Sequence, residues 1–282
     1  MSMAASFSFE LLKLRKRPAT WVLAVIMVLF VFFFDYFQFY SAITALEEGG
    51  QDPTGQITDV EEFKNYLLPA SVTVNVAGLL SFFGGPFALI IGALSAGSEY
   101  GWGTLKTSLT QRPGRLSILA GKFLAVGVAV AGLSVLALGA GAVSSYVVAG
   151  LFEGPVDWPG FGNVIKGLGI IWLILGAWAS LGVFLALIFR GTALAIGLGL
   201  IYGLVIESLI FGFSETSRII EALTYVLLGR NGGDLANSLG DAPRSFTSPE
   251  AVDPAQATLV LAGYVVLLLI TAALVFRWRD VT

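Results

Sequence analysis

Six apolar stretches constrain this chain more than any other feature of its sequence. A helix needs roughly 20 apolar residues to cross about 30 Å of hydrocarbon, and it satisfies its own backbone hydrogen bonds there. We therefore predict an all-α, polytopic membrane protein with one transmembrane domain over residues 1–282. The predicted spans cover about residues 19–40, 71–96, 116–148, 166–189, 192–211 and 257–276. Gly84-Gly85-Pro86 predicts a kink in the second span.

The composition supports a membrane protein and removes several kinds of chemistry. Only 12% of the residues are charged and the mean hydropathy is +0.84, whereas an average soluble domain is about 25% charged. Cysteine and histidine are both absent. The usual nucleophilic thiol, general base and soft metal ligand are therefore missing, so we expect no metal site and no enzymatic activity in this chain.

The distribution of lysine and arginine predicts the orientation. Short cytoplasmic loops carry an excess of these residues. With the N-terminus inside, eleven of the 16 lie on the cytoplasmic side: Lys13, Arg15, Lys16, Arg17, Lys106, Arg112, Arg115, Lys122, Arg190, Arg277 and Arg279. The other five lie outside: Lys64, Lys166, Arg218, Arg230 and Arg244. An even number of spans then places both termini in the cytoplasm.

Residues 4–17 are predicted to form an amphipathic helix on the membrane surface. Phe7, Leu11 and Leu14 share one stripe, and basic residues gather at its end near residue 17. Lipid is therefore an expected partner, whereas nothing in the sequence suggests a nucleic-acid partner.

A polar segment from Glu99 to Lys122 separates the second and third spans. Residues 104–111 favour a short helix, because glycines precede it and Pro113-Gly114 ends it. Two interpretations remain open from the pattern alone. The segment is either a solvated loop that fixes topology or a basic-edged helix that contacts a soluble protein.

The order Glu99, Gly103-Thr104-Leu105, Arg112, Gly121-Lys122 resembles the permease subunits of the type-two family of ABC exporters. The resemblance implies that residues 4–17 form an elbow helix and that the segment between the second and third spans is a coupling helix. The implied contacts with an ATP-binding subunit are Glu99, Gly103, Thr104, Leu105, Lys106 and Arg112. It also implies a bacterial plasma-membrane protein that pairs with a second permease copy, identical or related, with Gly199 and Gly203 of the fifth span at the dimer seam.

Such an exporter needs ATP, and this chain has no phosphate-binding loop. The segment from Gly114 to Lys122 has six residues between its glycines where the P-loop has four, and Phe123 follows where Ser or Thr is required. We expect no cofactor on this chain, with ATP and magnesium bound by the partner subunit. The resemblance allows a drug, peptide, lipid, glycan or ion as cargo, and the outer loops favour a small amphiphile or peptide.

Two acidic residues, Asp35 and Glu207, lie inside predicted spans. A charge in hydrocarbon is costly, so each is a candidate residue of the transport pathway that binds a cationic group or a proton. The alternative is that each faces a wet vestibule or bonds a neighbouring helix. They also support a rival function, an ion-gradient-driven secondary transporter. An intramembrane enzyme or a non-transporting scaffold are further alternatives.

The outer loops carry two further expectations. Residues 216–228 are amphipathic, which predicts an interfacial or re-entrant helix between the fifth and sixth spans, whereas residues 231–254 are predicted to be loop. The first outer loop is acidic and is interpreted as solvated, with a funnel for cations as the alternative. Its acids are Glu47, Glu48, Asp52, Asp59, Glu61 and Glu62.

Overall fold

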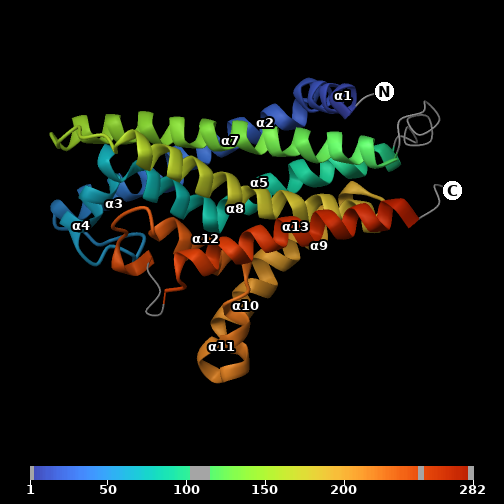
Figure 1. Ribbon diagram of the computed structural model, residues 1–282. Helices are drawn as coiled ribbons and strands as arrows, with labels where there is room; N and C mark the ends of the chain where they lie inside the picture. Colours follow the sequence, from blue (N-terminus) through green and yellow to red (C-terminus); the bar gives the residue numbers. More distant parts are fainter. Residues whose placement is uncertain (1–2, 102–114, 247–250, 279–282) are drawn as a thin grey trace.

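The computed structural model describes residues 3–101, 115–246 and 251–278, and every regular element in these ranges is a helix (Figure 1). Six of their helical stretches are long and apolar enough to cross a membrane. These stretches are Pro18–Glu47, Pro69–Tyr100, Ser117–Leu151, Phe161–Phe189, Thr192–Gly212 and Pro254–Arg277. The prediction of an all-α chain with six spans is confirmed.

The first span is one long helix with a change of register in its middle. Helix α1 (Met3–Lys16) ends before Arg17, whose backbone is extended, and Pro18 begins α2 (Pro18–Phe30) because proline fits the first turn of a helix. A π-helical segment, η1 (Val31–Phe37), then joins α2 to α3 (Gln38–Glu47). The span thus continues past residue 40 to Glu47.

The centre of the bundle is the crossing of α5 (Val72–Gly101) and α8 (Phe161–Phe189). A Cβ placed on Gly92 would lie 2.1 Å from the carbonyl oxygen of Ala179, and one on Gly182 would lie 2.1 Å from that of Leu89. The two backbones therefore touch, which only glycine allows. Two thirds of each of these spans is buried within the chain, at 67% in both cases.

Helix α7 (Arg115–Leu151) is continuous and longer than one crossing requires. Its apolar stretch of 35 residues is on the order of 50 Å long at 1.5 Å per residue. α7 lies along one side of the bundle, and α13 (Pro254–Trp278) lies along another (Figure 1). The described start of α1 and end of α13 lie at the same end of the bundle (Figure 1), as six crossings require.

The fifth span begins against α5 and α8 and then leaves the bundle (Figure 1). It consists of α9 (Thr192–Leu200), the π-helical segment η3 (Ile201–Ile206) and α10 (Glu207–Gly212). After η4 (Ser214–Thr216) comes α11 (Arg218–Thr224). Figure 1 shows α10 and α11 projecting away from the other helices, and only 17% of the span is buried within the chain. We call residues 192–224 the projecting arm.

The segment after the arm forms a buried helix, α12 (Leu228–Asn237), which packs against α5, α8 and α13. The expectation of a loop from residue 231 onward is wrong for this stretch. Its glycines and asparagines are typical of loops, but tertiary hydrogen bonds hold the helix. The Asn231 amide donates to the carbonyl of Tyr225 at 2.9 Å, and Asp234 accepts from the backbone nitrogen of Val252 at 2.9 Å.

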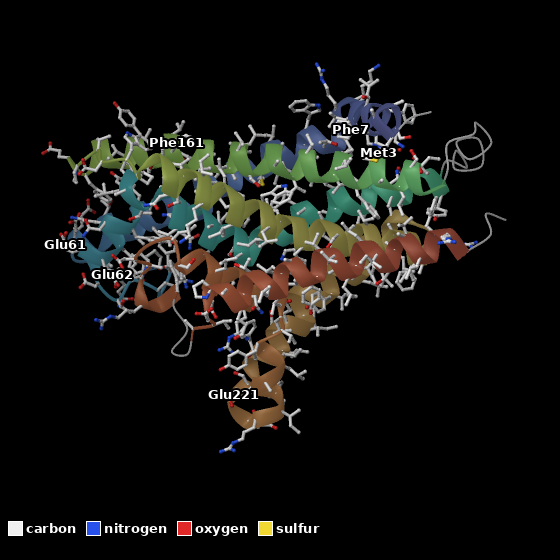
Figure 2. The ribbon with its side chains drawn as sticks, viewed as in Figure 1. Met3, Phe7, Glu61, Glu62, Phe161 and Glu221 are labelled. Carbon is white, nitrogen blue, oxygen red and sulfur yellow. The ribbon has the colours of Figure 1, made fainter. Side chains whose placement is uncertain are left out.

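The end of the bundle opposite the termini is covered by α4 (Val60–Leu67) and short 3-10 turns, η2 (Pro69–Ser71) and η5 (Arg244–Phe246). Asp59 caps α4 by accepting from the backbone nitrogens of Glu61 and Glu62 at 2.9 and 3.2 Å. Figure 2 shows both glutamates at this end of the molecule.

Candidate functional site

The predicted coupling residues lie partly outside the part of the chain that the structure describes. Gly103, Thr104, Leu105, Lys106 and Arg112 fall within residues 102–114, so their contacts with an ATPase remain predictions. Glu99 is described, because it lies in the last turn of α5.

Glu99 is buried, with 3% of its surface exposed, inside a cluster of opposite charges. The cluster comprises Glu10, Lys13, Glu99 and Lys122, which we call the ion network. Lys13 pairs with Glu10 at 3.0 Å and with Glu99. Lys122 pairs with Glu10 at 3.1 Å and with Glu99 at 3.2 Å. Each carboxylate thus contacts both ammonium groups, so the buried charges balance.

Lys122 is the most deeply placed cation of the network. It is 2% exposed and also donates to the carbonyl oxygen of Ser95 on α5 at 2.7 Å. Its neighbour Gly121 is needed for packing, because a Cβ there would lie 2.8 Å from the backbone nitrogen of Phe7. Figure 2 shows Met3 and Phe7 on α1, which lies across the end of α7. The Gly-Lys pair therefore lets α1 approach and then binds it.

Arg17 fastens the junction between α1 and α2 to the same end of α5. Its guanidinium donates to the carbonyl oxygen of Leu94 at 2.6 Å and to the Ser98 hydroxyl at 2.5 Å. Burial lowers the pKa of Arg17, while the charges of Glu10 and Glu99 act to raise it. Together with the ion network, Arg17 ties α1, α5 and α7 into one unit at the ends of the helices that flank residues 102–114.

The sequence reasoning missed the ion network. It assigned Glu99 to a partner surface and treated Lys13 and Lys122 only as topology signals. Glu10 was the available signal, since it is the one acid in a segment rich in basic residues. Glu10 in the predicted elbow and Glu99 at the end of the second span are two acids, and they pair with two lysines, Lys13 and Lys122.

Glu207 directly follows the π-helical segment η3 and is 4% exposed. Its carboxylate accepts hydrogen bonds from the backbone nitrogens of Leu228 and Gly229, both at 3.0 Å. These are the first N–H groups of α12, which have no partners within the helix. Glu207 therefore caps α12 from the fifth span, which realises the alternative of a bond to a neighbouring helix.

Glu207 also lines a cavity of about 390 Å³ beside α5, α8 and the arm. Its walls include Phe82, Phe83 and Trp178. The predicted seam glycines lie in the same wall. A Cβ on Gly199 would lie 2.2 Å from a methyl carbon of Leu89, and one on Gly203 would lie 2.7 Å from the Trp178 ring. Both glycines thus contact side chains of their own chain, and a role in dimer packing remains a prediction.

Asp35 lies within the π-helical segment η1 and is 3% exposed. One carboxylate oxygen, Oδ2, is buried with no hydrogen-bond partner among the described residues, and none of their ion pairs includes Asp35. Asp35 lines a second cavity, of about 500 Å³. Phe82 and Phe83 of α5 line both cavities, so they stand between the two acids.

The two acids share a local feature that the sequence does not show. A π-helical turn inserts a residue into the α-helical register, and such turns are frequent at functional sites. One π segment contains Asp35 and the other ends immediately before Glu207. Within residues 3–101, 115–246 and 251–278, no three acidic side chains gather closely enough to hold a metal ion.

A family comparison identifies this architecture. The model of the ABC-2 family transporter protein matches residues 4–281, which is nearly the whole chain. No curated protein matches the chain closely enough to count as a relative. The six apolar helices and this match agree on a multi-pass transport protein. The chain belongs to the ABC-2 transporter family, as a membrane permease.

Proposed function

We propose that this chain is the permease subunit of an ATP-driven exporter in the bacterial plasma membrane, with both termini in the cytoplasm. The observation that carries the proposal is the family match over residues 4–281. The chain has no phosphate-binding loop of its own. Separate ATP-binding subunits therefore supply ATP hydrolysis, with magnesium bound there and no catalytic site on this chain.

The coupling element is residues 102–114, with Gly103, Thr104, Leu105, Lys106 and Arg112 against the ATPase. Glu99 has a different part in this mechanism, because it is buried in the ion network. The network joins α1, α5 and α7 next to both ends of the coupling segment. A force on that segment therefore moves three helices together, which converts nucleotide-driven motion into a change of packing in the spans.

A second copy of the permease completes the pathway. The projecting arm is covered by its own chain over only 17% of the fifth span, and the Glu207 cavity opens beside it. Two copies that pack arm to arm would enclose this space between them. Gly199 and Gly203 then act at the seam through the close contact of the fifth span with α5 and α8, which sets the position of the arm.

The alternative is a secondary transporter that uses Asp35 and Glu207 with an ion gradient. Asp35 favours it, since its carboxylate is buried without a partner among the described residues. Glu207 does not, because both of its oxygens already accept backbone hydrogen bonds. The family match favours the ATP-driven reading.

The deciding experiment is gentle purification of the tagged chain from its native membranes, followed by mass spectrometry. We expect a stoichiometric P-loop ATPase, lost when Gly103-Thr104-Leu105 is replaced by a flexible linker. The matched control replaces Pro53-Thr54-Gly55, a turn at the opposite end of the bundle, and should retain the ATPase. A chain that purifies alone and moves solute in liposomes under an ion gradient would overturn the proposal.

A further inference from the structure

The Asp35 cavity has the chemistry of a binding site. It has a volume of about 500 Å³, enough for a molecule of drug size. Asp35 lies in its wall and is only 3% exposed. Its Oδ2 atom has no hydrogen-bond partner among the described residues. A buried carboxylate in this position is unfavourable unless it is neutralised by a proton or a cation.

Much of the rest of the wall is aromatic. Six rings line the cavity: Phe34, Phe39, Tyr66, Phe82, Phe83 and Phe246. They come from the first and second spans, α4 and η5. The faces of aromatic rings attract cations, most strongly cations with little hydration. Burial raises the pKa of the Tyr66 hydroxyl, and the charge of Asp35 adds to this effect, so the hydroxyl stays protonated.

The wall is a poor match for a bare metal ion. Metal ions such as calcium require six or more oxygens at 2.3–2.6 Å, whereas the side chains of this cavity of about 500 Å³ offer one carboxylate and three amides, Gln38, Gln56 and Asn237, among six rings. An organic cation uses both features, because its charge pairs with Asp35 and its apolar body contacts the rings. Entry is available beside Phe34, Phe82 and Phe83, which line the cavity and are 48%, 58% and 48% exposed.

We propose that the cavity between the first span, the second span and α12 binds an apolar organic cation, with Asp35 as its counter-ion. The inference rests on the proposed function in one respect, since it names the class of cargo that a permease would take. Binding itself needs neither ATP nor a partner subunit, so the two ideas can fail separately.

The test uses tetraphenylphosphonium as the probe and tetraphenylborate, which has the same shape and the opposite charge, as its control. Equilibrium dialysis measures binding to the full chain in nanodiscs of zwitterionic lipid, with empty nanodiscs subtracted. We expect saturable binding of the cation and none of the anion. Asp35→Asn should weaken cation binding by about tenfold or more. Glu48→Gln, which removes an exposed acid at the same end of the bundle, should leave it unchanged.

Phe82→Leu provides a second test that does not depend on the stability of the Asp35 variant. The Phe82 ring is 58% exposed, so its replacement should preserve the fold while weakening the cation several-fold. Equal binding of both probes, or an Asp35→Asn or Phe82→Leu chain that binds like the wild type, would overturn the proposal. Absence of tetraphenylphosphonium binding to the wild-type chain, when that chain still co-purifies with its ATPase, would refute the cargo site and leave the permease function intact.

Discussion

Single residues at the end of the bundle that holds α1 show how charge is used inside this protein. Four ionisable side chains gather there, two of each sign; three are buried and Lys13 is partly buried, and every carboxylate contacts both lysines. Buried ion pairs add little net stability when complete, but the loss of one partner leaves an uncompensated charge. The network therefore specifies where α1 docks more than it strengthens the fold.

Lys122→Met should release α1 from the bundle. It removes the more deeply buried of the two cations that bridge Glu10 and Glu99, which are 2% and 3% exposed. One buried negative charge is then uncompensated, which costs about 3–5 kcal/mol of stability. Titration of the purified chain with SDS measures the loss, and trypsin cleavage at the basic residues of α1 should accelerate.

The matched control is Lys64→Met at the opposite end of the bundle. Lys64 pairs with Glu47 at 2.5 Å, but the glutamate side chain is 46% exposed. Such surface pairs contribute within about 1 kcal/mol. Equal effects of the two substitutions would mean that the ion network has no special role in holding α1.

At the scale of the element, the helix α12 depends on a residue from the fifth span. Its sequence has little helical tendency, and Glu207 supplies the cap that its own N-terminus lacks. Glu207→Ala would leave the N–H groups of Leu228 and Gly229 unsatisfied, at about 1–3 kcal/mol for each buried group. Denaturant titration should show this loss of stability, and proteases should cleave residues 228–246 faster than in the wild type.

Glu221→Ala serves as the comparison for that prediction. Glu221 lies on α11 at the tip of the projecting arm, away from the other helices (Figure 2). Its replacement should change stability by less than about 0.5 kcal/mol. If Glu207→Ala is equally harmless, the cap does not hold α12.

The crossing of α5 and α8 is the tightest contact between elements. Gly182→Ala would place a Cβ 2.1 Å from the Leu89 carbonyl oxygen, and a backbone atom cannot move aside as a side chain can. We expect a loss of about 3 kcal/mol or more, at the upper end of what overpacking costs. Gly176→Ala on the same helix meets no atom within 4 Å, so an equal loss in that control would contradict the argument.

For the whole molecule, the main feature is the projecting arm, whose fifth span is only 17% buried within a single copy of the chain. If two permeases pair through it, cysteines at Leu204, Val205, Ser208 and Leu209, introduced one at a time, should cross-link with helical periodicity. The chain has no native cysteine, so each new thiol is unique. Val143 on α7, 67% exposed, is the control position. Cross-linking at residue 143 but nowhere on the arm would place the dimer seam elsewhere.

The sequence by itself determined the membrane class, the number of spans and the family. These follow from the length and apolarity of segments, which depend on local composition because each span must satisfy its own backbone in lipid. The Gly121-Lys122 pair was recognised from the order of residues in the chain. The sequence did not show why glycine and lysine are needed at these two positions. The identity of Asp35 and Glu207 as unusual residues also needed no structure.

Only the tertiary structure decided what those residues contact. Glu99 pairs with Lys13 and Lys122 inside the chain because α1 packs against α7. No local sequence pattern encodes that packing. The helix at residues 228–237 was missed because its stability comes from Glu207 and from burial, against the preference of its own glycines. Asp35 and Glu207 differ for the same reason. The N-terminus of α12 lies beside Glu207, and an aromatic cavity lies beside Asp35. Both environments are set by packing between segments far apart in the chain.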